Sequence, residues 1–209
     1  MKIMPNSESQ QKYADVLKNA DIPVVVGVGP AGSGKTHLAC DAFVDLFERG
    51  IYKRLILTRP SVKVEGEDFG FIPGSLSQKM DPWIQPIYEI LGNYYTKTQL
   101  KKMIDSNVID VVPLAYMRGR SFHQSFVLAD EMQNATPAQL KMLLTRLGKD
   151  SKMVLTGDLE QSDLTSGVNG LQSFVQRYIE RPLSGAEMVQ MKGEDVQRSP
   201  FVRDFLQWW

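Results

Sequence analysis

The chain has 209 residues, and its 24 lysine and arginine residues balance 24 aspartate and glutamate residues, so its formal net charge is zero. A length near two hundred suits one globular domain that can bury a core without disulfides or structural metals. The single cysteine, Cys40, excludes an intramolecular disulfide and cysteine-rich zinc or iron–sulfur sites. The sequence has no apolar run near the ~20 residues of a membrane span and no apolar signal core, so we expect a reducing, cytoplasmic location without membrane binding. The neutral balance does not indicate a nucleic-acid-binding protein, so any basic surface must be local.

Short apolar strands alternate with helical segments along the chain. The run Pro23–Val28 is rich in valine, as expected of a strand buried on both faces of a sheet. Apolar residues recur at helical spacing over His37–Arg49, and the same spacing after a capping box predicts a helix over 137–147. Four further strands are predicted, at Arg54–Thr58, Asp110–Pro113, Ser125–Ala129 and Lys152–Thr156. This alternation predicts an α/β domain whose mostly parallel sheet has helices on both faces and binds ligands at the carboxyl ends of its strands.

Two stretches interrupt the alternation of strands and helices, and a third lies at the C-terminal end of the chain. Residues 59–82 are rich in glycine, proline and charge and predict a long loop or hairpin. Residues 83–107 predict one or two helices, so that 59–107 forms an insertion in the domain. Apolar residues at helical spacing in 200–209 predict a C-terminal helix. Because no linker or repeat divides the chain, we expect a single domain over residues 1–209.

One segment matches a phosphate-binding loop of the pattern G-x-x-x-x-G-K-[ST]. Its members are Gly29, Pro30, Ala31, Gly32, Ser33, Gly34, Lys35 and Thr36. The segment follows a predicted strand and opens a predicted helix, which is the context that the chemistry requires. Glycines let backbone N–H groups curl around phosphate oxygens, and the helix N-terminus adds partial positive charge. Lys35 would neutralise the β- and γ-phosphates of ATP, and the Thr36 hydroxyl would bind Mg²⁺.

A second polar segment follows the strand Ser125–Ala129. This apolar strand ends in Asp130 and Glu131, the pattern of a Walker B segment. Asp130 would hold Mg²⁺, and Glu131 would polarise the attacking water. Two solvated acids at the end of a strand are the simpler alternative, but the phosphate loop elsewhere in the chain favours a nucleotide site.

A third strand end carries Gly157-Asp158-Leu159-Glu160-Gln161. The pattern G-D-x-x-Q after a strand resembles the sensor motif of superfamily 1 helicases, in which the glutamine contacts the γ-phosphate. A turn capped by Asp158 is the competing interpretation. The phosphate-binding loop, the Walker B pair and this motif each follow a predicted strand, as in a nucleotide site. This agreement favours Gln161 as the sensor.

Two residues occupy places that are functional in the same superfamily. Gln10 stands upstream of the first strand, where those helicases place an adenine-reading glutamine, and Gln11 is the alternative. Arg59 follows a strand as motif Ia does, which suggests contact with nucleic acid. A surface charge or an ordinary ion pair is the alternative for Arg59.

Four more arginines are candidates for phosphate chemistry. Arg118 and Arg120 flank a glycine and suit contacts with nucleic-acid phosphates. Arg198 is the candidate for an arginine finger that stabilises transition-state charge, and Arg146 is its rival. For each of them a solvated charge or an ion pair is the alternative.

The order of motifs resembles the PhoH family of P-loop ATPases. The resemblance rests on GPAGSGKT, LTRPSV, FVLADEMQNATPAQLKMLLTRLG and DVQRSPFV, and it covers nearly the whole chain. It implies a single RecA-like domain that hydrolyses ATP with Mg²⁺ and is associated with single-stranded RNA. It also implies a homo-oligomeric, hexameric ring in which an arginine of one subunit, here Arg198, completes the site of the next. The family's finger segment reads V-V-R-H-P, so the histidine after the arginine is absent here.

These residues leave three function classes open. An ATP-driven RNA motor or helicase-like remodeller fits the sensor glutamine and the arginines. An ATP-dependent protein-assembly switch or chaperone-like ATPase fits the zero net charge. A small-molecule kinase fits least, because such enzymes seldom place glutamate directly after the Walker B aspartate.

Overall fold

The computed structural model describes residues 4–60, 76–164, 168–196, 201 and 208, and for residues 76–83 it describes the backbone alone. The described strands form one parallel sheet in the order β3-β2-β4-β5-β1-β6. Their bounds are β1 Val24–Val28, β2 Arg54–Thr58, β3 Ile109–Val111, β4 Ser125–Ala129, β5 Lys152–Gly157 and β6 Ala186–Gln190. Because β5 lies between β1 and β4, the segments that follow these three strands meet at one edge of the sheet.

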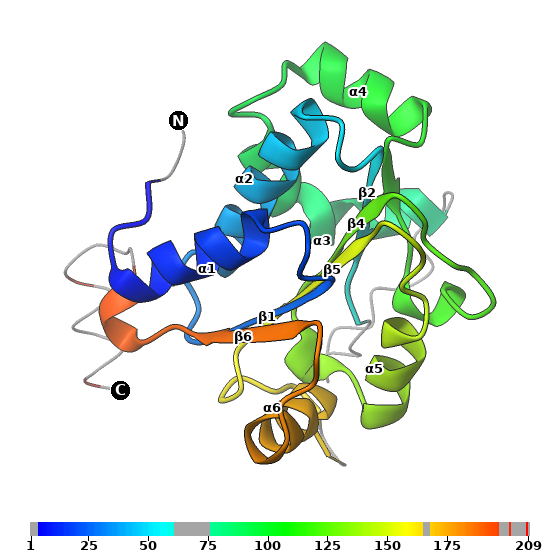
Figure 1. Ribbon diagram of the computed structural model, residues 1–209. Coiled ribbons are helices and arrows are strands. Elements are labelled where there is room, and N and C mark those ends of the chain that lie inside the picture. Colours follow the sequence, from blue (N-terminus) through cyan, green and yellow to red (C-terminus); the bar gives the residue numbers. More distant parts are fainter. Residues whose placement is uncertain (1–3, 61–75, 165–167, 197–200, 202–207, 209) are drawn as a thin grey trace.

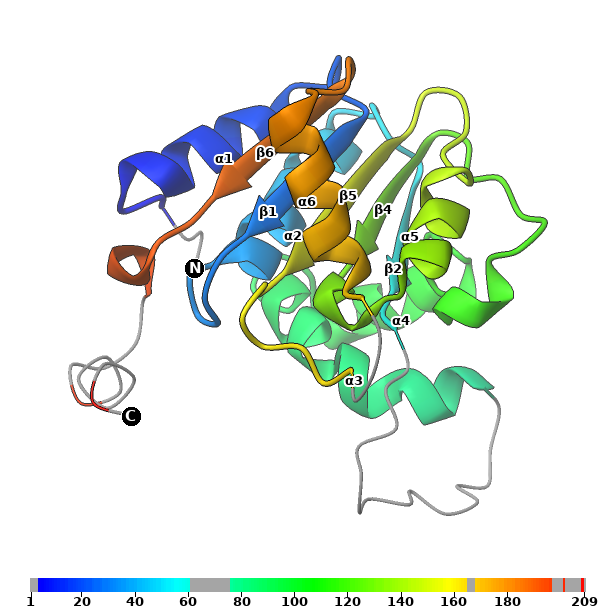
Figure 2. The same ribbon diagram turned by 90° about the horizontal axis from the view of Figure 1, so that it is seen from below.

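Helices cover both faces of this sheet, as Figures 1 and 2 show. One face carries α1 (Glu8–Lys18), α2 (Lys35–Glu48) and α3 (Leu76–Leu91), and α4 (Lys97–Asp105) leads into β3. The opposite face carries α5 (Pro137–Leu144) and α6 (Gly170–Glu180). The described residues also form three short 3₁₀ turns: η1 (Leu114–Tyr116), η2 (Met132–Asn134) and η3 (Gly193–Asp195).

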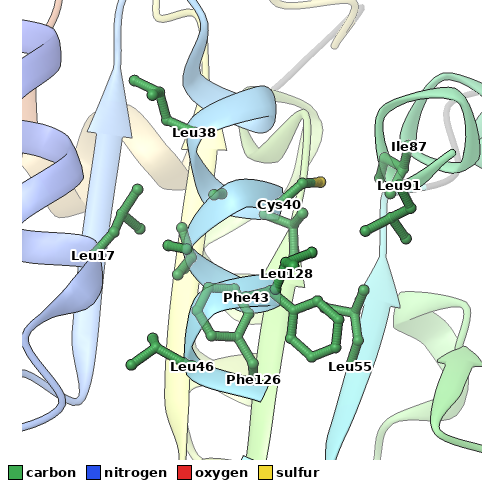
Figure 3. Packing of buried hydrophobic residues seen from close by; sticks show 14 of the residues in the cluster. Leu17, Leu38, Cys40, Phe43, Leu46, Leu55, Ile87, Leu91, Phe126 and Leu128 are labelled. Carbon is green, nitrogen blue, oxygen red and sulfur yellow. The ribbon is translucent and has the colours of Figure 1, made fainter. Parts of the chain in front are cut away.

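The two faces of the sheet have separate apolar clusters because side chains alternate along each strand. In β4, Phe126 and Leu128 point toward α2, whereas Val127 points toward α5. Figure 3 shows the first cluster, in which Phe43 of α2 lies against Phe126, with ring centroids 5.8 Å apart. Cys40 is fully buried in this cluster, as expected for a core cysteine. The central strands are apolar on both sides, as their continuous apolar sequences indicated.

The predicted α/β fold with a parallel sheet flanked by helices is confirmed. The helix predicted over 137–147 is α5, and its capping box is present: Thr136 Oγ1 accepts a hydrogen bond from Gln139 N, and Gln139 Oε1 accepts one from Thr136 N. The strand predicted at Asp110–Pro113 is shorter and begins earlier, because Pro113 instead precedes η1.

Part of the predicted loop 59–82 is helical, because α3 begins at Leu76. Pro82 lies inside this helix and explains why its first part was not predicted, since proline usually ends a helix. The elements α1, α6 and β6 were not predicted; β6 is an edge strand that includes Glu187 and Gln190. Residues 200–209 lie outside the described part of the chain, except Phe201 and Trp208. Of the helices that are described, none is both long enough and apolar enough to cross a bilayer.

Candidate nucleotide-binding site

The loop between β1 and α2 has the backbone conformation of a phosphate-binding loop. Gly29, Gly32 and Gly34 have φ angles of 147°, 82° and 89°, in the region that favours glycine. A Cβ atom on Gly29 would lie 2.6 Å from the carbonyl oxygen of Met191, so this position also lacks room for a side chain. Gly34 caps α2, whose first residue is Lys35. The loop therefore directs backbone N–H groups and the helix N-terminus toward the carboxyl edge of the sheet.

Lys35 is almost fully buried against its own loop. Its Nζ donates hydrogen bonds to the carbonyl oxygens of Gly29 (2.6 Å) and Pro30 (2.8 Å) and to Ser33 Oγ (3.3 Å). Burial lowers the pKa of Lys35, while neighbouring carboxylates act in the opposite direction. Those carboxylates belong to Asp158, Asp130 and Glu131. An anionic phosphate beside this ammonium group would favour its charged form.

Asp130 is held by two hydroxyl groups from two different elements. Thr36 Oγ1, in the first turn of α2, donates to Asp130 Oδ1 at 3.0 Å. Thr156 Oγ1, near the end of β5, donates a second, short hydrogen bond to the same oxygen. A hydroxyl and a carboxylate in contact at a phosphate-binding loop are the hard oxygen ligands that Mg²⁺ prefers. The donor set therefore fits Mg²⁺.

Thr156 was not singled out from the sequence, although it lies on the strand that carries the sensor motif. The side chain is fully buried, and its hydroxyl points to the end of the neighbouring strand β4. The rule that polar residues at strand ends gather at one edge of a parallel sheet could have identified it.

Glu131 adopts a left-handed backbone conformation, with φ 56° and ψ 38°. This conformation is unfavourable for a residue with a side chain by about 1–2 kcal/mol. Its Oε2 accepts a hydrogen bond from Gln133 Nε2 at 2.5 Å. The other end of that amide, Gln133 Oε1, accepts a hydrogen bond from Asp158 N at 3.2 Å. Gln133, another residue that sequence reasoning missed, thus connects the Glu131 carboxylate to the segment after β5.

Asp158 in turn contacts the phosphate-binding loop. Its Oδ2 accepts a hydrogen bond from Ala31 N at 3.2 Å, and its Oδ1 accepts one from Glu160 N at 3.1 Å. The backbone N–H of Gln161 is bound to the Asp158 carbonyl oxygen at 3.3 Å. Asp158 therefore ties the turn that carries Gln161 to the loop that would hold the phosphates.

These groups surround one cavity of about 440 Å³. Residues of the phosphate-binding loop and of the ends of β2, β4 and β5 line it, including Lys35, Thr36, Arg59, Asp130, Glu131, Asp158 and Gln161. Helix α3 closes one side with Pro86, Ile87 and Ile90. The cavity combines cationic and hydrogen-bond-donating groups with a metal-binding pair, which suits a triphosphate with its divalent cation.

The family model described as PhoH-like protein matches residues 2–209. The chain belongs to the PhoH-like family. It is 42% identical over 198 residues to the PhoH-like protein of Bacillus subtilis (strain 168), a match that covers 95% of this chain and 61% of that protein. It is 34% identical over 202 residues to the protein PhoH of Escherichia coli (strain K12), covering 94% of this chain and 55% of that protein. The chain thus spans a little more than half the length of these relatives.

The fold of this PhoH-like chain is also similar to that of a solved ATPase core. The SWI2/SNF2 ATPase core of Sulfolobus solfataricus, solved in complex with dsDNA, matches with a TM-score of 0.52 and 14% identity. The match covers 92% of this chain and 45% of that one. It supports the RecA-like arrangement predicted from the sequence.

In the PhoH-like chain, Gln10 lies behind the phosphate-binding loop. Its side chain is 1% exposed, and its Nε2 donates to the carbonyl oxygens of Ser33 (3.0 Å) and Asp195 (3.1 Å). Its Oε1 accepts a hydrogen bond from Asn6 N at 2.8 Å. These contacts attach α1 to the loop, and Gln10 is absent from the cavity lining. The alternative residue, Gln11, is exposed and donates to Asp15 on the same helix.

The structure separates the candidate arginines. Arg59 lines the cavity. Arg118 is exposed, whereas Arg120 donates to Asp110 at 2.9 Å and lies over the Phe122 ring, 5.2 Å from its centroid. Arg146, the rival finger, donates to the carbonyl oxygen of Arg120 at 3.2 Å, away from the cavity lining. Arg198 lies outside the described residues.

Proposed function

We propose that the chain binds ATP with Mg²⁺ and hydrolyses it. The observation that carries this proposal is the convergence of three strand ends and the phosphate-binding loop on one cavity, with Thr36 bound to Asp130 at 3.0 Å. Family membership and the RecA-like fold agree with it. The curated relatives are longer than this chain, so its activity is inferred from its own site.

Each residue of the site has a distinct part in this reaction. Backbone N–H groups of Gly29–Thr36 and the Lys35 ammonium bind the β- and γ-phosphates. Mg²⁺, held by Thr36 and Asp130, would supply charge that neutralises the phosphate oxygens. Glu131 accepts a proton from the water that attacks the γ-phosphorus, as the bond to the ADP oxygen breaks and phosphate leaves. Gln161 contacts the γ-phosphate and reports its loss through the turn at Asp158.

We further propose that ATP turnover drives remodelling of single-stranded RNA. The loop after β3 supports this proposal, because Tyr116 is 61% exposed and the exposed Arg118 follows it. An aromatic ring and an adjacent guanidinium suit base stacking and phosphate binding. Arg120 steadies this loop through its ion pair with Asp110. RNA rather than DNA is proposed from the family resemblance.

The oligomeric state belongs to the same proposal. A RecA-like domain has one lobe, so a motor needs a second lobe from a neighbouring subunit. We infer a hexameric ring in which Arg198 of one subunit reaches the cavity of the next. A reducing, cytoplasmic location is part of the same proposal and rests on the sequence, which has a single cysteine and no apolar signal core.

A protein-assembly switch is the second candidate, and one surface favours it. Exposed apolar side chains lie on and beside α6, at Val168, Ile179 and Leu183. Val168 also lines a groove between α5 and α6. Apolar surface of this kind suits a protein partner more than a phosphate backbone.

Steady-state hydrolysis of Mg²⁺–ATP, with and without single-stranded RNA and DNA, tests these functions. Glu131→Gln serves as the blank, because it is expected to bind ATP while hydrolysis falls by about 10²-fold or more. Stimulation by RNA, with binding that weakens steeply with salt, supports the RNA remodeller. Unstimulated turnover supports the protein switch. Equal turnover in the wild type and Glu131→Gln contradicts the assigned base.

A further inference from the structure

Arg59 is the one cationic side chain on the cavity wall, among the described residues, that does not come from the phosphate-binding loop and its helix. It follows the last residue of β2, and Thr58 O accepts a hydrogen bond from Asp130 N at 3.0 Å. The register pairs Thr58 with Ala129, so Arg59 and Asp130 leave adjacent strands side by side.

Alternation along the two strands places Arg59 and Asp130 on the same face. Leu57 of β2 and Leu128 of β4 belong to the cluster beneath α2 and α3. Two residues further along each strand, Arg59 and Asp130 continue on this face, because successive side chains alternate. Asp130 meets Thr36 there, and Arg59 shares the cavity with both. Position and strand geometry agree that the guanidinium faces the metal and γ-phosphate side of the cavity.

Within the part of the chain that the structure describes, Arg59 has no ion-pair partner. Three carboxylates, those of Asp130, Glu131 and Asp158, line the same cavity. The carboxylates are committed elsewhere, since Asp130 accepts from two hydroxyls and Glu131 from Gln133. A half-buried guanidinium in this situation is available to an anionic ligand in the cavity.

Proline after Arg59 restricts where this side chain can go. Proline disfavours the helical conformation of the residue before it and favours extended backbone, and Pro60 is buried. The backbone at Arg59 therefore continues the direction of β2 to the rim of the cavity. A fixed backbone limits the positions that the long arginine side chain can reach. This restriction preorganises the guanidinium for binding a phosphate.

We propose that Arg59 is a catalytic residue that binds the γ-phosphate of ATP within its own subunit. This inference rests on the proposed ATPase function, and it replaces the expectation that Arg59 contacts nucleic acid. The guanidinium distinguishes ATP from ADP, because only ATP places an oxygen-rich group between Lys35 and Glu131. In the transition state it stabilises charge on the transferred phosphoryl group, as an arginine supplied in cis does. No proton or electron leaves the arginine in this step.

The decisive measurement is the affinity of each variant for ADP and for a non-hydrolysable ATP analogue, both with Mg²⁺, by titration calorimetry. Arg59→Ala is expected to weaken binding of the ATP analogue by about 10- to 100-fold, the effect of a lost charged hydrogen bond. Its affinity for ADP should change by less than about threefold. Arg59→Lys keeps the charge but loses the forked geometry, so it should restore only part of the discrimination.

Two controls separate failure of this inference from failure of the proposed function. Arg181→Ala removes an exposed arginine outside the cavity, at a position with no proposed role in nucleotide or RNA binding, and should leave both nucleotide affinities unchanged. If the wild type binds neither nucleotide, the ATPase proposal itself fails.

If the wild type prefers the ATP analogue to ADP and Arg59→Ala shows the same preference, the assignment of Arg59 is wrong. Loss of RNA binding with full nucleotide discrimination also overturns it, in favour of a nucleic-acid contact. If Arg59→Ala does not fold, Arg59→Lys and Arg59→Gln decide by the same ratio of affinities.

Discussion

Gln133 and Glu131 form a 2.5 Å hydrogen bond in which the amide Nε2 donates to the carboxylate Oε2. Glu131 has a left-handed backbone conformation, with φ 56° and ψ 38°, just before η2. Gln133 is 2% exposed, and its other end accepts from Asp158 N. The proposed catalytic base is therefore oriented by a buried amide that is also hydrogen-bonded to the turn carrying Gln161. The proposed γ-phosphate contact of Gln161 would be linked to Glu131 by hydrogen bonds through Asp158 and Gln133.

Gln133→Ala tests this positioning role. Without the amide, Glu131 can leave its productive orientation, and a misplacement of about 1 Å reduces turnover on the order of 10²-fold. Nucleotide affinity should stay within a factor of about three, because Gln133 does not line the cavity. Steady-state kinetics should therefore show a fall in kcat with little change in KM.

Gln172→Ala is the matched control, because it removes an exposed glutamine on α6. Thermal unfolding should be followed in parallel, since Gln133→Ala also leaves the Asp158 N–H unpaired, at about 1–3 kcal/mol. A rise in KM with unchanged kcat would contradict the positioning role.

Thr156→Val tests the second hydroxyl on Asp130. Valine has nearly the same shape but cannot donate the hydrogen bond, so the carboxylate loses one of its two orienting groups. Loss of such a supporting contact lowers metal affinity by about 10- to 100-fold. We expect ATP-analogue affinity to fall in Mg²⁺ but to be unchanged in EDTA. Thr156→Ser keeps the hydroxyl and should behave as the wild type; equal loss with and without Mg²⁺ would argue against a role in metal binding.

The sequence predicted the main residues that line this cavity, but it did not predict the hydrogen bonds that connect them. Lys35, Thr36, Asp130 and Glu131 follow buried strands in recognisable patterns, and parallel strands necessarily bring their carboxyl ends together. Gln133 could not be found in this way. Its contact with Glu131 depends on the left-handed turn at that residue, and turn geometry is not readable from apolar spacing.

The fold shows the same division between strong and weak signals. The four central strands were predictable because both faces are buried, so each contains a run of consecutive apolar residues. The edge strand β6 was missed because one side is solvated and its sequence mixes polar and apolar residues. The first part of α3 was missed because Pro82 lies within the helix. Tertiary packing of Ile87 and Leu91 against the first cluster outweighs this local preference.

Arg198 and Arg146 can be distinguished as fingers by complementation. Arg198→Ala is expected to reduce turnover on the order of 10³-fold with nucleotide affinity retained. Arg146→Ala should change turnover by less than about threefold, because that side chain is bound to Arg120 and Thr145. If the finger acts between subunits, mixing Arg198→Ala with Lys35→Ala should restore part of the activity that each variant lacks. No recovery on mixing, at concentrations where the oligomer forms, would count against a finger supplied by the neighbour.

The burial of Lys152 is expected to make the free energy of unfolding depend on pH, independently of catalysis. This fully buried lysine donates to the carbonyl oxygens of Val16 (3.3 Å), Asn19 (2.9 Å) and Ile22 (2.7 Å), near the end of α1. Burial lowers its pKa to about 8 in the folded chain. The unfolded chain keeps the proton to a pH of about 10.4, so between these values it binds more protons than the folded chain. Stability from this group therefore rises with pH in that window, by about 1 kcal/mol between pH 8 and 9.

Urea unfolding of the wild type and of Lys152→Met at pH 7.5, 8, 8.5 and 9 measures this contribution. Burial raises the pKa of Cys40 well above its usual range, which lowers stability as the pH rises through the value of an exposed thiol. Cys40 acts equally in both proteins, so the difference between their slopes isolates Lys152. From pH 7.5 to pH 9, the free energy of unfolding of the wild type should rise relative to that of Lys152→Met, because methionine has no proton to lose. Parallel slopes would mean that the Lys152 ammonium keeps its proton in the folded chain to the same pH as in the unfolded one.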